Sequence, residues 1–109
     1  MSNDGKYKMI SLEQAKVLAE SVAESCFANL VAVPPESWIR TNFFEEENCW
    51  LFLKNDHLLF RENCEDSADA AIVISKKGTT MTVADLGEDE SALKEYLKKI
   101  SDYLGNRGE

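Results

Sequence analysis

The stretch Cys49-Trp50-Leu51-Phe52-Leu53 decides the fold of this chain. A charged turn, Glu45-Glu46-Glu47-Asn48, precedes it, and Lys54-Asn55-Asp56-His57 follows it. An apolar run this short between turn signals cannot form an independent helix, so it predicts a β-strand. Alternate side chains of a strand point to opposite faces, and here both sets are apolar. We therefore expect the central strand of a sheet that is covered on both faces.

Two amphipathic helices are predicted, one before this strand in the sequence and one after it. A capping box opens the first, and apolar side chains then recur at helical spacing over residues 12–27. The second follows a cap at Asp89 or Ser91, and its apolar residues repeat in the same way. Gly105 has the residue type that favours the position after a helix, so we expect the second helix to end there.

The segment before the charged turn alternates in the manner of a half-buried strand. In this interpretation Ile39 and Phe43 point to the core, whereas Trp38 and Arg40 share the outer face. Two hypotheses for Trp38 remain open at this point. The ring folds over the rim of the core, or it joins Arg40 as a contact for a partner, because both residue types are common at interface hot spots.

Further β character appears in three places. Residues 70–74 are apolar on both faces, and residues 79–84 form a β-branched run with one polar face, with Gly78 in the turn between them. Residues 30–33 are short and β-prone. The chain is thus predicted to be an α+β domain, with an N-terminal helix, an antiparallel sheet of about four to five strands and a C-terminal helix, the helices packed on the sheet. One domain spans residues 1–109, with an ordered core at about 9–105.

The net charge of −8 restricts the classes of partner. Nucleic acid and anionic membranes require a basic surface, so we expect neither as a partner. Residues 36–69 contain nine acidic and three basic side chains, so this segment alone carries −6. Such a concentration of acid favours a basic partner. Since no apolar leader or spanning segment is visible, we expect a cytoplasmic protein.

The residues needed for catalysis or metal binding are scarce. The chain has one histidine, His57, and three cysteines that form no Cys-x-x-Cys pair. Cys26 and Cys49 lie in apolar patterns and are predicted to be core residues, whereas Cys64 lies in a polar segment. We expect no enzymatic activity, no metal and no cofactor. A pocket that held His57 together with Cys64 would revive an enzymatic hypothesis.

Residues 10–104 resemble the YrhB-like family, which is grouped with the immunity proteins of bacterial polymorphic toxins. The resemblance rests on four segments, the last of them in the C-terminal helix: Ile10-Ser11-Leu12-Glu13-Gln14-Ala15, Trp50-Leu51-Phe52-Leu53 with Asn55, Ile72-Val73-Ile74 with Ser75-Lys76-Lys77-Gly78, and Glu95-Tyr96-Leu97. The chain departs from the family pattern at Asp69-Ala70-Ala71, which stands where the family has Gly-Pro.

The resemblance implies a protein that binds and neutralises a cognate toxin domain. An acidic surface framed by aromatic side chains suits the basic cleft of a toxin, because complementary charge steers association and aromatic or arginine side chains anchor the complex. The chain itself is expected to be a monomer or a weak dimer. The candidate contact residues are Trp38, Arg40, Phe44, Glu45, Glu46, Glu47, Glu62, Glu65 and Asp66.

Two alternatives stay open. The run Glu45-Glu46-Glu47 is either a solvated turn or a contact whose self-repulsion a basic partner relieves. The whole chain could instead be a small acidic secretion chaperone that binds an effector segment as a dimer. The chaperone hypothesis requires self-association and an exposed apolar groove.

Overall fold

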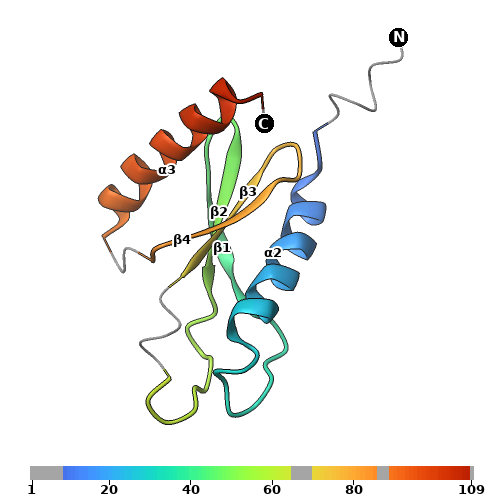
Figure 1. Cartoon of the computed structure of the whole chain (residues 1–109), viewed down its shortest axis with the longest axis vertical. Helices are drawn as coiled ribbons and strands as arrows, with labels where there is room; N and C mark the ends of the chain where they lie inside the picture. Colours follow the sequence, from blue (N-terminus) through green and yellow to red (C-terminus); the bar gives the residue numbers. More distant parts are fainter. Residues whose placement is uncertain (1–8, 65–69, 86–88, 109) are drawn as a thin grey trace.

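The computed structural model describes residues 9–64, 70–85 and 89–108 and confirms the α+β architecture. Two helices, α2 (Leu12–Phe27) and α3 (Glu90–Asn106), flank four strands in the chain order. The strands are β1 (Ile39–Glu45), β2 (Cys49–Lys54), β3 (Ala71–Ser75) and β4 (Thr80–Val83). Figure 1 shows the sheet between the two helices.

The sheet is an antiparallel meander in which spatial order follows sequence order, β1-β2-β3-β4. Strand β2 pairs with β1 on one side and with β3 on the other, and all its residues except Lys54 are buried. This position confirms the central strand expected from its apolar faces. The strands β1 and β4 form the two edges.

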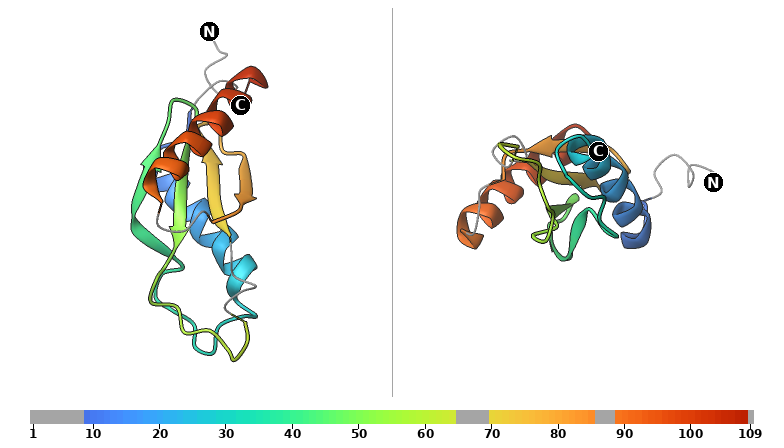
Figure 2. Two further views of the ribbon diagram at one scale, coloured as in Figure 1. Left: turned by 90° about the vertical axis from the view of Figure 1, so that its left-hand side faces the viewer. Right: turned by 90° about the horizontal axis from the view of Figure 1, so that it is seen from below.

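The two faces of the sheet carry separate hydrophobic cores. On one face Trp50 and Phe52 pack with Ile72 against α2, and on the other face Leu51 and Val73 pack against α3. Figure 2 shows the helices on opposite sides of the sheet. The alternation of strand side chains produces this division, because adjacent residues of β2 and β3 serve opposite cores. The molecule is thus a three-layer helix–sheet–helix arrangement.

Helix α2 approaches the sheet through small side chains. Ala15, Ala19 and Ala23 are fully buried, and Phe27 completes the same stripe at i+4 intervals. The predicted capping box of Ser11 and Gln14 is present. Cys26, which the sequence pattern placed in the core, is exposed because the buried stripe advances from Ala23 to Phe27 and leaves Cys26 beside it.

Helix α3 has the predicted cap at Asp89, whose side chain accepts a hydrogen bond from the Ala92 N–H. The prediction that Gly105 terminates this helix is wrong, since α3 continues to Asn106. A Cβ atom at Gly105 would lie 2.6 Å from Nδ2 of Asn48. The glycine therefore permits close contact between α3 and the turn after β1.

Strand β1 contains an irregularity that the alternation pattern did not reveal. Ile39 pairs with Lys54 and Phe43 with Phe52, so β1 has two more residues than β2 between these pairs. This bulge re-aims the side chains around it. Trp38 lies before β1 and packs with Ile39 and Phe43 on the α2 side, so the expected outer face shared by Trp38 and Arg40 does not form.

The remaining β-prone segment, residues 30–33, forms only an isolated bridge between Val31 and Phe60. The turn between β3 and β4 has Gly78 at a φ of +96°, as predicted. Among the described residues no helix is both long and apolar enough to cross a membrane.

Candidate binding groove between β1 and α3

The turn that joins β1 to β2 is tight. The Glu46 N–H donates to the Cys49 carbonyl over 2.8 Å, which leaves Glu47 and Asn48 as the two loop residues. Paired residues of an antiparallel ladder alternate between hydrogen-bonded and non-hydrogen-bonded pairs. Because Glu46 and Cys49 form a hydrogen-bonded pair, the backbone groups of Phe44 also face β2, whereas those of Phe43 and Glu45 face away from it.

Asn48 connects this turn by hydrogen bonds to helix α3 and to the turn between β3 and β4. The Asn48 N–H donates to Oγ of Ser101 over 2.9 Å, and its side-chain Nδ2 donates to the Ser101 carbonyl over 2.9 Å. The Lys76 N–H donates to the Asn48 carbonyl over 2.9 Å. Since Gly105 also permits close approach here, the C-terminal half of α3 is held against the end of the β1–β2 hairpin.

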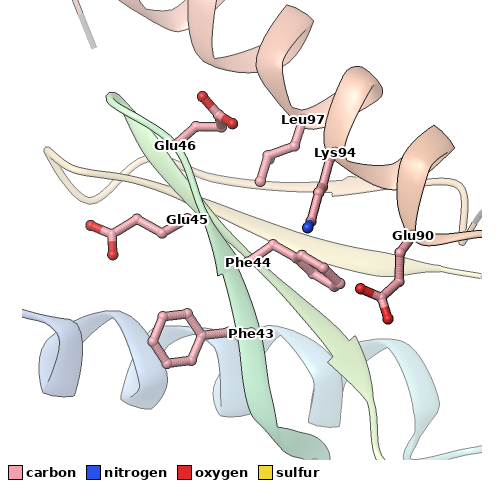
Figure 3. A pocket seen from close by; sticks show the side chains of 7 residues that line it. All are labelled: Phe43, Phe44, Glu45, Glu46, Glu90, Lys94 and Leu97. Carbon is pink, nitrogen blue, oxygen red and sulfur yellow. The ribbon is translucent and has the colours of Figure 1, made fainter.

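A groove with a volume of about 390 Å³ lies between β1 and the N-terminal half of α3. Its walls combine aromatic, aliphatic and charged side chains from these two elements. Figure 3 shows Phe44 and Lys94 pointing toward each other across the groove, with Glu46 and Glu90 at its rim. The lining residues are Phe43, Phe44, Glu45, Glu46, Glu90, Lys94 and Leu97.

The charge of the groove is negative, with three carboxylates and one ammonium group. Glu45 is already compensated, because its Oε2 lies 2.5 Å from Nζ of Lys76, which also sits 4.4 Å from the centre of the Trp50 ring. Within residues 9–64, 70–85 and 89–108, neither Glu46 nor Glu90 forms an ion pair. These two carboxylates are thus the groups that a cation entering the groove would meet.

The buried thiol beneath this turn is inert at neutral pH. The pKa of Cys49 is raised from 9.0 to about 11, chiefly by burial and also by the charge of Glu46, against a hydrogen bond to Ser101 and the charge of Lys76 that lower it. A thiol is a nucleophile only as the thiolate. Cys49 therefore acts as a small core residue, as the sequence pattern predicted.

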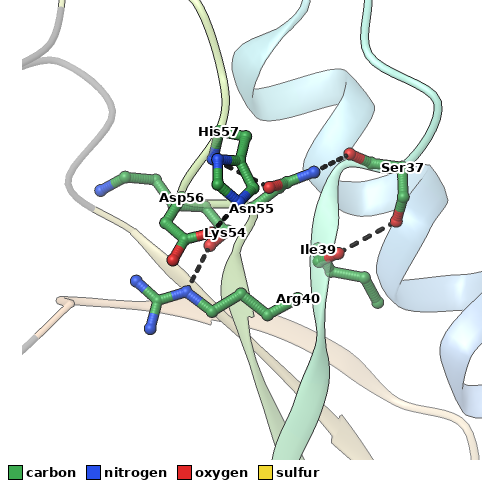
Figure 4. Close-up of polar contacts among 7 residues, drawn as sticks. All are labelled: Ser37, Ile39, Arg40, Lys54, Asn55, Asp56 and His57. Atoms are coloured by element: carbon green, nitrogen blue, oxygen red, sulfur yellow. Dashed lines mark hydrogen bonds and ion pairs between the residues drawn. The ribbon is translucent and has the colours of Figure 1, made fainter.

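A second, polar pocket of about 370 Å³ lies at the other end of β1. Arg40 Nε donates to the Lys54 carbonyl over 3.0 Å, and Asn55 Nδ2 donates to the Ser37 carbonyl over 2.8 Å (Figure 4). The side chain of His57 is 90% exposed, and its Nε2 lies 3.6 Å from Oδ1 of Asp56. Cys64 is not among the residues that line this pocket.

The structure separates the predicted contact residues into several places. Phe44, Glu45 and Glu46 meet in the groove, and Glu47 is exposed in the adjacent turn. Arg40 lines the polar pocket instead. Trp38 is partly buried against the α2-side core, and its backbone N–H donates to Oε1 of Glu20 over 2.6 Å. This position agrees with the hypothesis that its ring folds over the rim of the core.

The rest of the predicted acidic surface lies elsewhere. Glu62 is exposed in the segment after β2. Figure 1 shows this segment, residues 55–64, at the end of the sheet opposite the β1–β2 turn. Glu65 and Asp66 lie outside the described residues. The acidic segment 36–69 therefore does not present all of its carboxylates on one face. Sequence reasoning missed Glu90, Lys94 and Leu97, because only the packing of α3 brings them beside β1.

Among the described residues, no group of three or more His, Cys, Asp or Glu is placed to hold a metal ion. No protein family, curated protein or solved structure was found to match this chain. The groove between β1 and α3 is thus characterised by its geometry and charge alone.

Proposed function

We propose that this chain is a binding protein of the immunity type, which neutralises a bacterial toxin domain by occluding a basic cleft. The observation that carries the proposal is the groove in which Phe44 lies between the carboxylates Glu46 and Glu90. An aromatic anchor beside carboxylates that lack a cationic partner suits a Lys or Arg side chain, whose stem can cover the ring while its charged end reaches the acid.

The charge distribution of the whole molecule supports the same proposal. The net charge of −8 attracts a basic partner from a distance, and complementary charge raises the association rate more than it raises the final affinity. Both walls of the groove are set on rigid elements, because Asn48 and Gly105 hold α3 against the hairpin. A preformed site loses less conformational freedom on binding than a flexible one.

A secretion chaperone is the second candidate, and one observation favours it. The exposed apolar side chains Val33 and Leu59 belong to neighbouring segments, because the Ala32 N–H donates to the Leu59 carbonyl over 2.7 Å. A chaperone that works as a dimer could bury such a patch. Its molecular mass in solution, measured by light scattering at high protein concentration, distinguishes the two: the chaperone hypothesis requires a dimer.

The direct test of the first proposal is co-expression with the protein encoded next to this chain in its genome. We expect that protein alone to arrest growth of a bacterial host and co-expression of this chain to restore growth. The purified pair should form a complex that weakens with rising salt, since screening reduces attraction between charges. A neighbouring product without toxicity or without affinity for the chain would contradict the proposal.

A matched pair of variants assigns the effect to the groove. Glu46→Gln with Glu90→Gln removes two charges from the groove, whereas Glu24→Gln with Glu36→Gln removes two exposed charges from α2 and the segment before β1. We expect the groove variant to bind the toxin about tenfold more weakly or worse, and with a smaller salt dependence, than the control variant. Equal affinities for the two variants would exclude the groove as the electrostatic contact.

A further inference from the structure

Among the described residues, no strand pairs with the outer edge of β1. β1 is the terminal strand of the sheet, and the alternation set by the Glu46–Cys49 pair turns the N–H and C=O groups of Phe43 and Glu45 outward. Backbone groups of this kind are the template to which an extended peptide adds as a new strand. The bulge between Ile39 and Phe43 interrupts this template at its other end.

The groove lies beside this open edge, and its position determines which side chains would enter it. Phe44 and Glu46 belong to the α3 side of β1, since Phe44 pairs with Leu51 and packs with the α3-side core. A residue of an added strand that stands opposite Phe44 or Glu46 would project to the same face. Those alternate residues of the incoming segment therefore meet the Phe44 ring, Glu46 and Glu90 (Figure 3).

The other edge of the sheet provides an internal comparison. In β4 the backbone groups of Thr80 and Thr82 face outward, because Ser75 and Thr79 form a hydrogen-bonded pair at the turn. The residues of β4 include no carboxylate, and its exposed side chains are those of Thr80 and Thr82. Both edges offer backbone groups, and β1 adds a negative groove with an aromatic wall.

We propose that the partner binds by strand addition, placing an extended segment with Lys or Arg at alternate positions antiparallel to β1 as a fifth strand of the four-stranded sheet. The basic residues enter the groove toward α3, and apolar residues between them face Phe43 on the α2 side. This inference deepens the proposed function and rests on it for the identity of the partner as a basic protein. The binding mode itself is tested separately from that identity.

The test uses amide hydrogen exchange measured by NMR on the full chain. The probe is a short acetylated and amidated peptide of alternating Val and Arg. At saturating peptide we expect exchange of the Phe43 and Glu45 amides to slow by about tenfold or more, and exchange of the Thr80 and Thr82 amides to stay unchanged. Contact through side chains alone would leave all four amides unaffected.

Two modified peptides keep every charge and separate pairing from simple attraction. N-methylation of the Val amides, which face β1 when Arg points into the groove, blocks the new ladder and should abolish the protection of Phe43 and Glu45. N-methylation of the Arg amides, which face away from β1, should preserve it. Glu46→Gln with Glu90→Gln should weaken the unmodified peptide about tenfold relative to Glu24→Gln with Glu36→Gln.

Three results overturn strand addition: no binding of the unmodified peptide, binding without protection of the Phe43 and Glu45 amides, or equal binding of the two N-methylated peptides. None of these results affects the co-expression test, which reports on toxin neutralisation. Conversely, a chain that fails to neutralise the neighbouring protein but protects these amides when the peptide binds would retain the binding mode and lose the proposed function.

Discussion

The two faces of the sheet differ in whether the sheet or the helix contributes the larger side chains to the core. Toward α2, large side chains of the sheet such as Trp50 and Phe52 pack against a helix lined with alanine. Toward α3, smaller side chains of the sheet such as Cys49 and Val73 pack against leucine and isoleucine from the helix. Each face reaches close packing by pairing large with small residues. On the α3 side, a groove opens between β1 and the N-terminal half of α3.

The largest effect should come from removing an aromatic ring from the α2 side. Phe52 is fully buried, so Phe52→Ala should lower the free energy of unfolding by about 3–5 kcal/mol. Urea denaturation measures this change. Leu51→Ala, one residue away on the α3 side, should cost less, because a smaller side chain leaves a smaller cavity. A larger cost for Leu51→Ala would contradict the expectation that truncation destabilises the α2-side core more than the α3-side core.

The pH dependence of stability should report on the α3 side through Cys49. Its pKa is about 11 in the folded chain against 9.0 for the ordinary thiol, so the unfolded state loses the proton first as pH rises. The contribution of Cys49 to the free energy of unfolding is therefore constant below pH 9 and falls between pH 9 and 11, by up to about 2–3 kcal/mol. The difference between wild type and Cys49→Ala in urea denaturation isolates this contribution from other titrating groups. Parallel stability profiles for the two proteins would show that the Cys49 thiol makes no contribution.

Overfilling the alanine stripe tests how closely α2 approaches the sheet. Ala19 is fully buried, so Ala19→Leu should lower the free energy of unfolding by about 1–3 kcal/mol. Val17 lies on the same helix with 69% of its surface exposed, and Val17→Leu should change stability by no more than about 0.5 kcal/mol. Thermal or urea denaturation compares the two. Tolerance of leucine at position 19 would mean that the α2 layer has space to move outward.

The smallest predicted effect concerns the contact between Gly105 of α3 and Asn48. Gly105→Ala places a methyl group against Nδ2 of Asn48 and disturbs its hydrogen bond to the Ser101 carbonyl. In an Asn48→Ala background this clash is absent, and alanine regains its ordinary helical advantage over glycine. The effects of Gly105→Ala in the two backgrounds should therefore differ by about 1 kcal/mol in a double-mutant cycle. Additive effects would indicate that Asn48 moves aside freely.

Much of the fold could be predicted because its signals are local. The apolar run at 49–53 predicted a central strand, and the capping box with its helical repeat predicted α2. The positive φ of Gly78 followed from turn chemistry. Predictions failed where a position depended on contacts distant in sequence. Gly105 was taken for a helix terminus, although its small size serves the contact with Asn48.

The candidate site was predicted only in part for the same reason. Phe44 and Glu46 belong to the acidic stretch that the sequence displays, whereas Glu90 and Lys94 come from a helix more than 40 residues away. Trp38 precedes β1 and packs against the α2-side core, whereas strict alternation placed it on the outer face of a longer strand. Linear charge counting also grouped Glu62 with the turn at 45–47, although the segment 55–64 and that turn lie at opposite ends of the sheet (Figure 1).

The sequence by itself determined the α+β class, the central strand and the excess of acid, because hydrophobic periodicity and composition depend on each residue and its near neighbours. Only the tertiary structure decided that α2 and α3 cover opposite faces, that β1 is an open edge, and that Glu46 and Glu90 share a groove. Those features depend on contacts between residues distant in the sequence, such as those of Asn48 with Ser101 and Gly105. Short-range patterns carry no information about such contacts.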